Sequence, residues 1–428
     1  MIIFLLFPLL SFVHCTEFVS LQVYLILGDN EIFEPNYPPS LKDAFISAVA
    51  QIQNIVMVSP LKEFNLSMSD IDECLQTRAA HKEVLHAFTV SGRNVTRRKT
   101  YQYSKSFSMD DANFLLFLQF EGDRCNIDRD LMSSATPCLV RRGNRPIGAV
   151  VRMCPNIERW ADFLPGQRAI DVFRHEILHG LGFGTIIPRN NPTPADSTIK
   201  WEYNNDVQFG VRRFMDFASR ATEYARQYFK CNALEGVETE EQSKKHLNEY
   251  IFGNELMTPI LSSGPNYFSE ISARILEDTY IGEQPWYSVN RRYIQSEINS
   301  YWYGRGWGCA FAVGSCYDYI SSKKRKSEST FPFCSSSDYL RRDQSLRVCT
   351  KDSLMQYAFR CDSLSMDKSA NSLNGIKPWS LSQFVGVSSL ANYMPSDAET
   401  RFCPFVRVIS NDEEFQAPNY TEMVPCST

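Results

Sequence analysis

The chain has 428 residues, of which 43% are hydrophobic and 22% charged, a composition typical of folded globular proteins. Two or three packed subdomains are expected, because this length exceeds what one small core can bury. The formal net charge of −5 offers no basic surplus, which argues against a nucleic acid or an anionic membrane surface as the partner.

The N-terminus predicts an exported protein. Residues 2–13 form an apolar run of signal-peptide length that is too short to span a bilayer, and Val13-His14-Cys15 offers a cleavage site before Thr16. The run lacks the positive residue that usually precedes it, and the alternative is a buried strand of a cytosolic protein. No apolar tail closes the sequence, so we expect secretion, with at most a peripheral place at the cell surface and neither a transmembrane helix nor a glycolipid anchor.

Cysteine usage supports export. Cleavage after residue 15 would remove one of the 13 cysteines and leave an even set without a CxxC zinc pair. Such a set predicts a disulfide framework, whose connectivity the sequence does not give. The remaining cysteines are Cys74, Cys125, Cys138, Cys154, Cys231, Cys309, Cys316, Cys334, Cys349, Cys361, Cys403 and Cys426. Sequons at Asn65, Asn94 and Asn419 predict N-glycosylation on the same route.

The first 180 residues predict an α+β lobe. Residues 18–28, 113–121 and 147–153 are rich in β-branched and aromatic side chains and predict strands. Residues 41–56 place apolar side chains at helical spacing and predict an amphipathic helix. A second helix is expected over residues 168–181, where the glycines that follow end it.

The sequence pattern and composition change after residue 184. Residues 207–230 are expected to form a helix with aromatic anchors, and residues 267–280 a further helix. Beyond about residue 304 the chain is Cys-dense and Ser-rich, which predicts a loop-rich lobe held by disulfides.

The strongest chemical signal is the run His175-Glu176-Ile177-Leu178-His179 within the second predicted helix. Residues four apart lie on one helix face, so both imidazoles can reach one metal ion at about 2.0–2.1 Å. Glu176 lies beside the metal, where it can take a proton from a zinc-activated water and deliver it to the leaving amine. The alternative is a helix whose two histidines only pack or face solvent.

A hydrolytic zinc site needs three protein ligands and one open position. The extended pattern HExxHxxGxxH would place the third ligand at position 185, which is Thr185. His14 would leave with the signal peptide, and His81 and His86 lie in a charged stretch and are expected at the surface. His246 is therefore the best candidate for the third ligand.

A methionine supports His246. Met257 follows it within a segment that predicts a Met-containing turn, a soft apolar floor beneath three imidazoles. The competing class of peptidase uses a glutamate from a downstream helix as third ligand, and Glu202, with Asp206 four residues on, is the candidate for that class. Gly182 favours the histidine class, because it fits the compact turn that follows the helix there.

These residues resemble the leishmanolysin/invadolysin family of zinc metallopeptidases. In that family an insertion of about this size displaces the third histidine from the helix, and the Met-turn follows closely. The resemblance covers residues 110–320 well and the flanks loosely. It rests on residues 175–183, His246, residues 254–259, 275–279 and 302–311, and on Cys138, Cys154 and Cys231.

The resemblance implies an α+β, metzincin-type fold. Its catalytic domain would have a twisted mixed sheet and an active-site helix, followed by a central α-rich lobe and a disulfide-rich C-terminal lobe. We therefore expect a signal peptide over residues 1–15, an N-terminal catalytic subdomain over 16–183, a central subdomain with the third histidine and Met-turn over 184–303, and a Cys-rich subdomain over 304–428.

The resemblance also implies a secreted endopeptidase with one catalytic Zn²⁺, held by His175, His179 and His246, and Glu176 as general base. Its substrates would be proteins and peptides bound in extended form along a sheet edge, and we expect a monomer. A catalytically silent, zinc-containing adhesin of the same fold is the alternative. Family members usually carry a pro-segment whose cysteine blocks the zinc, but the surroundings of Cys74 do not resemble such a switch, so the sequence does not indicate how a latent form is held.

Overall fold

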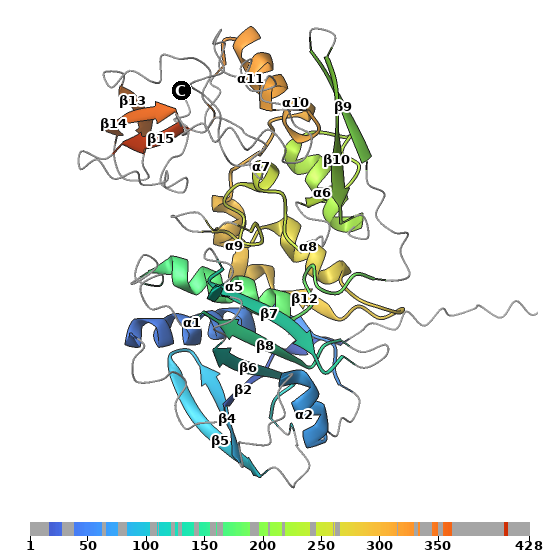
Figure 1. Ribbon diagram of the computed structural model, residues 1–428, viewed down its shortest axis with the longest axis vertical. Helices are drawn as coiled ribbons and strands as arrows, with labels where there is room; N and C mark the ends of the chain where they lie inside the picture. Colours follow the sequence, from blue (N-terminus) through green and yellow to red (C-terminus); the bar gives the residue numbers. More distant parts are fainter. Residues whose placement is uncertain are drawn as a thin grey trace, which may run out of the picture.

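The computed structural model describes residues 17–333 with short gaps, and three strands beyond them (Figure 1). Only the backbone is described for those three strands and for residues 68, 73, 84, 102, 197–203, 206–212, 316–318, 321 and 324. The gaps are residues 28–37, 62–65, 76–83, 103–108, 110, 121–124, 127–130, 141–144, 155–159, 161–165, 189–196, 204–205, 216–218, 240–244, 260, 262–265, 315 and 329–332. The predicted signal peptide, His81 and the sequons at Asn65 and Asn419 lie outside the described residues.

Six strands form one mixed sheet, in the order β5 (Asn94–Gln102), β4 (Val84–Ser91), β2 (Val23–Leu27), β6 (Phe114–Phe120), β8 (Gly148–Met153) and β7 (Ser133–Cys138). The three middle strands β2, β6 and β8 run parallel to one another, whereas β4, β5 and β7 are antiparallel to their neighbours. The strands predicted over residues 18–28, 113–121 and 147–153 are confirmed as β2, with the short β1 (Val19–Ser20) before it, β6 and β8.

Both faces of the sheet are covered, which explains the continuous apolar run of β2. Leu25 belongs to the core beneath α1 (Pro39–Ile55) and α5 (Gln167–Gly180), whereas Tyr24 and Ile26 belong to a second core with α2 (Met68–Leu75). Successive strand residues point to opposite faces, so a strand buried on both sides needs no polar alternation. Both helices predicted in this half, over residues 41–56 and 168–181, are confirmed as α1 and α5.

A strand from the second half of the chain pairs with a strand from the first half. Strand β12 (Tyr287–Val289) pairs with β3 (Val56–Val58), which also pairs with β1. The helix predicted over residues 267–280 is confirmed as α8 (Glu270–Asp278), and α9 (Arg291–Ser300) follows β12. Figure 1 shows α8 and α9 lying between the sheet with α5 and the helices α6 (Ser219–Phe229), α7 (Glu249–Phe252), α10 (Cys309–Ala312) and α11 (Cys316–Arg325).

The helix predicted over residues 207–230 is wrong in its first half. Residues 206–214 form strand β10 (Asp206–Phe214), which makes a hairpin with β9 (Ser197–Tyr203) and pairs at its end with β11 (Glu238–Thr239). Val207, Phe209 and Val211 alternate with their neighbours, and this period of two is the strand pattern. Only α6 retains the predicted helix.

Three disulfides confirm part of the predicted framework. Cys74–Cys138 joins α2 to β7, Cys125–Cys154 holds the end of β8, and Cys231–Cys309 joins the end of α6 to α10. Cys74 is therefore a paired structural cysteine. The side chains of the other six cysteines that follow Cys309 lie outside the described residues, where the backbone shows a small antiparallel sheet of β13 (Ser345–Cys349), β14 (Leu354–Cys361) and β15 (Val406–Ile409).

In the part of the chain that the structure describes, none of the helices combines the length and apolar character that crossing a bilayer requires.

Candidate metal centre

Helix α5 carries two of the predicted ligands and lies tightly against the sheet. Its apolar side chains pack toward α1 and the sheet, with the Phe173 ring edge-on to Phe45 and stacked on Trp160. A Cβ at Gly180 would lie 2.6 Å from the Cβ of Ala149 on β8, so the absence of a side chain there sets how closely the helix approaches. The histidine face of α5 is thereby fixed relative to the sheet.

The imidazoles of His175 and His179 face each other through their Nε2 atoms. The Nδ1 of His175 lies 2.7 Å from the carbonyl oxygen of Leu256, and the Nδ1 of His179 lies 2.8 Å from that of Phe183. A carbonyl can only accept, so each Nδ1 carries the proton and each Nε2 keeps its lone pair. The two Nε2 atoms are 2.9 Å apart, an arrangement of two acceptors that a shared cation would stabilise.

Electrostatics keep these imidazoles neutral. Burial, together with the neighbouring His246, lowers the pKa of His175 to about 3. Burial and both other histidines lower the pKa of His179 well below its usual range. Neutral imidazole is the form that binds a metal, so burial favours the metal-binding form of both side chains.

The third imidazole comes from a loop. His246 lies with its ring centroid 5.2 Å from that of His175 and 4.9 Å from that of His179. One ligand nitrogen from each of the three histidines lies within 4.8 Å of the others, which makes them a candidate metal-binding group among the described residues. The structure thus brings together three residues that are separated by as many as 71 positions in sequence, the interval from His175 to His246.

Gly184 makes room for the loop that carries His246. Its φ of +61° lies in the left-handed region, and a Cβ there would meet the carbonyl oxygen of Lys245 at 2.3 Å. Gly182, with φ of +112°, turns the chain out of α5 so that the Phe183 carbonyl returns to His179. The glycines therefore do more than end the helix, because they also set how closely the segment that carries His246 approaches α5.

Met257 lies in the predicted turn. Its side chain is fully buried, and its carbonyl oxygen accepts a hydrogen bond of 2.9 Å from the backbone N–H of Leu247, the residue after His246. The preceding carbonyl, of Leu256, is the one that holds His175. The turn is thus connected through backbone groups to two of the three histidines.

Glu176 is buried between α5 and the edge strand β7. Burial raises the pKa of its carboxyl group to about 8, opposed by the backbone N–H of Ala135 and, more weakly, by the ammonium of Lys245. Figure 1 shows β7 at the edge of the sheet beside α5. A carboxyl group whose pKa lies near neutrality is suited to proton transfer.

The other predicted candidates lie elsewhere. His86 is on β4 and its Nδ1 lies 3.1 Å from the Thr100 hydroxyl, as expected of a surface histidine. Glu202 is on strand β9, so it is not on the helix that the glutamate-ligand class requires, and its side chain lies outside the described part. Thr185, at the position of a contiguous third ligand, donates its hydroxyl to the His179 carbonyl at 2.8 Å.

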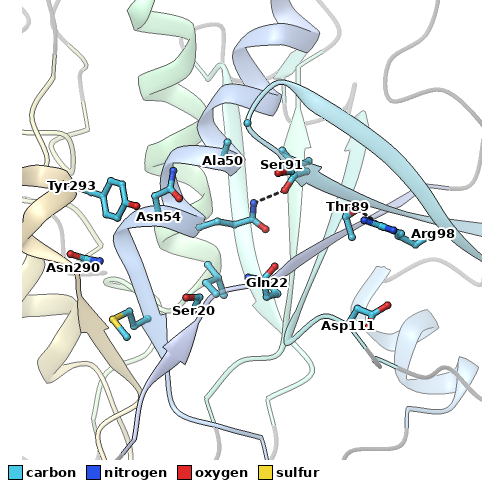
Figure 2. A pocket seen from close by; sticks show the side chains of 15 residues that line it. Ser20, Gln22, Ala50, Asn54, Thr89, Ser91, Arg98, Asp111, Asn290 and Tyr293 are labelled. Carbon is cyan, nitrogen blue, oxygen red and sulfur yellow. Dashed lines mark hydrogen bonds between the residues drawn. The ribbon is translucent and has the colours of Figure 1, made fainter.

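A polar surface groove lies apart from the histidines, between α1, the β4–β5 hairpin and the start of α9 (Figure 2). Several of its polar groups already have structural partners: Gln53 spans the Val23 N–H and the Val90 carbonyl, and Arg98 donates to Thr89. None of the three histidines lines it. The histidine cluster is therefore the stronger candidate site.

Several groups of the site gave no signal in the sequence. They are backbone carbonyls, the edge-strand N–H of Ala135 and the side chain of Lys245, none of which belongs to a recognisable spacing. Gly184 could have been found, because a second glycine directly after the HExxH helix suggests a close backbone approach.

The donor set fits zinc. Three imidazoles converge, of which His175 and His179 are neutral and oriented by carbonyl acceptors, and a tetrahedral catalytic zinc takes three protein ligands of this type. An HExxH helix with a third histidine from a later loop and a neighbouring glutamate is the arrangement expected of the HExxH metallopeptidases.

The chain belongs to the leishmanolysin family, whose family model matches residues 72–411. It is 26% identical over 366 residues to a leishmanolysin-like peptidase of Drosophila melanogaster, covering 75% of this chain and 51% of that protein. It is also similar to a leishmanolysin-like peptidase of Caenorhabditis elegans (26% identity, 67% of this chain and 48% of that one) and to leishmanolysin of Leishmania amazonensis (26%, 44% and 29%). The chain spans about half the length of the first two relatives.

Proposed function

We propose that the protein is a zinc-dependent endopeptidase whose ion is held by His175, His179 and His246. The observation that carries the proposal is the convergence of these three imidazoles next to the buried carboxyl group of Glu176. When bound, zinc supplies Lewis-acid chemistry, polarising a water molecule and a substrate carbonyl.

The chain's own residues account for the remaining steps. The Glu176 carboxylate takes a proton from the attacking water and later gives it to the leaving amine. Burial favours the protonated form of this group, so it can hold the proton between the two steps. The carbonyls of Leu256 and Phe183 fix the ring orientation of the two helix ligands, which keeps the lone pairs aimed at one point.

Extended polypeptide is the proposed substrate. Strand β7 is the last strand of its sheet, and its Ala135 N–H lies against Glu176, so a peptide that lies along this strand passes the catalytic carboxylate. Backbone pairing along a sheet edge provides affinity without demanding a particular sequence. This supports a broad rather than a narrow specificity.

The wider setting follows the family. We propose a metzincin-type arrangement with Met257 in its Met-turn, and a monomeric protein. We also propose that the protein is secreted, because its three disulfides form most readily in an oxidising compartment. The exposed Asn94, at the start of β5, is a proposed glycosylation site.

Cleavage of an unstructured protein by the purified chain, with zinc content measured on the same sample, tests the function. We expect about one zinc per chain, cleavage that a chelator stops and zinc restores, and loss of cleavage in Glu176→Gln with zinc retained. Stoichiometric zinc without cleavage, unchanged by Glu176→Gln, would instead support the silent adhesin.

A further inference from the structure

The turn that holds His175 is itself anchored by a buried acid. Glu255 is fully buried, and its Oε2 accepts a hydrogen bond of 2.6 Å from the backbone N–H of Met257. That N–H belongs to the same peptide group as the Leu256 carbonyl, which accepts from His175 Nδ1 at 2.7 Å. One planar peptide group therefore joins the carboxylate on one side to the imidazole on the other.

The other oxygen of the acid is also engaged. Glu255 Oε1 accepts a hydrogen bond of 2.9 Å from the backbone N–H of Ser269. The turn is closed by Thr258, whose hydroxyl donates to the Glu255 carbonyl at 2.8 Å. With both carboxylate oxygens held, Glu255 has little freedom to move, so it can serve as a fixed point for the peptide group.

The segment Asn266–Ser269, here called the strap, carries this anchor back to α5. Its four consecutive backbone N–H groups donate to four acceptors: Asp171 Oδ2 (3.0 Å), the Asn254 carbonyl (3.0 Å), Glu297 Oε2 (2.8 Å) and Glu255 Oε1 (2.9 Å). The Tyr267 carbonyl in turn accepts from the Leu256 N–H at 2.8 Å.

These hydrogen bonds connect two positions of α5 to each other through residues outside the helix. Asp171 binds the strap, the strap binds Glu255, Glu255 binds the Leu256–Met257 peptide group, and that peptide group binds His175. Asp171 and His175 are one helical turn apart on the same face. Arg174, buried on the same helix, binds Glu297 at 2.7 Å and so fixes the strap to α9 as well.

We propose that Glu255 is a positioning residue for the metal centre, acting on His175 through the peptide group between Leu256 and Met257. A carboxylate at the N–H of an amide polarises it and makes its carbonyl a stronger acceptor, which fixes the imidazole and increases the basicity of its Nε2. Carboxylates that bind a ligand histidine directly have this effect in many zinc sites. Here a peptide group lies between the two.

Glu255→Gln tests the relay, because the amide is of the same size but can accept at only one of the two positions. Glu277→Gln is the matched control: Glu277 is also buried and accepts from a backbone N–H, that of Val289 at 3.0 Å, as well as from Arg291, but it contacts no group of the turn. Glu255→Asp, which keeps the charge but shortens the reach, is the second variant in case the amide prevents folding.

Three readouts are measured on the full chain: zinc affinity by competition with a chelator, the visible absorption spectrum of the cobalt(II)-substituted protein, and the thermal midpoint of the metal-free protein. We expect Glu255→Gln to weaken zinc binding by about 10- to 100-fold and to alter the cobalt spectrum. Glu277→Gln should lower the thermal midpoint and leave zinc affinity and spectrum unchanged.

A Glu255 variant that is only less stable, with unaltered zinc affinity and cobalt spectrum, would overturn the relay. The relay presupposes the zinc site of the proposed function but not its catalysis. A chain that binds zinc but cleaves nothing would defeat the proposed function and leave the relay testable, and a chain that binds no zinc would defeat both.

Discussion

Helix α5 and the segment of residues 245–258, here called the loop although it includes α7, both contribute histidines to the proposed metal centre, but they are held by different forces. In α5 the spacing of His175 and His179 follows from the period of the helix, which local backbone hydrogen bonds maintain. The position of His246 depends instead on the close approach of Gly184, which is distant in sequence, and on the hydrogen bond from the Leu247 N–H to the Met257 carbonyl within the loop.

Because of this difference, substitutions in the helix and substitutions in the loop should impair the site in different ways. A change in the helix ligands removes a donor and leaves the geometry of the rest intact, since the helix persists. A change in the supports of the loop should move His246 as a whole without removing any donor. Substitutions at the two places can therefore distinguish the loss of a chemical group from its displacement.

The largest effect is expected for Glu176→Gln, which removes a base from the helix and displaces nothing. Turnover of a peptide substrate should fall by about 10²- to 10⁴-fold, the usual contribution of a positioned general base, while zinc affinity stays within a few-fold. Steady-state kinetics with zinc analysis check this. Retention of most of the turnover would mean that Glu176 is not the base.

The same variant has a pH-dependent effect on the metal-free protein. The pKa of Glu176 is about 8 in the folded protein against an ordinary 4.5, so between these values the folded state binds more protons and loses stability as the pH rises. Glu176→Gln should therefore stabilise the metal-free protein by on the order of 1–3 kcal/mol at pH 8 and very little at pH 4.5. Denaturant unfolding at both pH values checks the sign, and a difference independent of pH would contradict it.

His246→Ala should weaken zinc binding by about 100-fold or more, since loss of a direct ligand exceeds the 10- to 100-fold cost of losing an outer partner. Glu202→Ala is the comparison, because it would be the damaging change if a glutamate were the third ligand. Chelator competition on both variants distinguishes the two. Intact affinity in His246→Ala would show that the loop does not supply a ligand.

The sequence predicted the helix half of this comparison almost completely and the loop half only in outline. The HExxH spacing is local, so His175, Glu176 and His179 could be placed on one helix, and α5 extends from Gln167 to Gly180 as expected. His246 was reached by eliminating other histidines and by resemblance. Its backbone supports could not be predicted, because carbonyl and N–H groups are the same at every residue.

The strands were predicted where one pattern dominated. The apolar runs of β2, β6 and β8 are unambiguous because both faces of the sheet are buried. The β9–β10 hairpin was missed because aromatic residues near its end also fit helical spacing, and only the alternation of Val207, Phe209 and Val211 indicates the strand.

Gly184→Ala should displace the loop without removing a ligand. The variant combines left-handed strain of about 1–2 kcal/mol with a backbone clash against Lys245, so we expect a loss of roughly 3 kcal/mol in unfolding free energy and weaker zinc binding. Gly92→Ala is the matched control, since Gly92 has nearly the same φ, +59°, and nothing within 4 Å of a Cβ. It should cost only the left-handed strain of about 1–2 kcal/mol and leave zinc affinity unchanged. Equal effects in the two variants would mean that the close approach is unimportant.

The smallest effect is expected from Lys245, a charge of the loop that acts on a group of the helix. Its ammonium lowers the pKa of Glu176, so Lys245→Met should raise that pKa and move the acidic limb of the pH–activity profile upward. Bound zinc would lower the pKa of Glu176 in both proteins, so its effect would cancel in the difference between them. Lys42→Met, on α1, is the control, because Lys42 does not contribute to the Glu176 pKa.

Lys245 is exposed, so the shift should shrink in about 1 M salt, where the screening length is near 3 Å. A shift that persists in salt would indicate displacement of His246 rather than loss of a charge, and Lys245 would then belong with Gly184 among the supports of the loop.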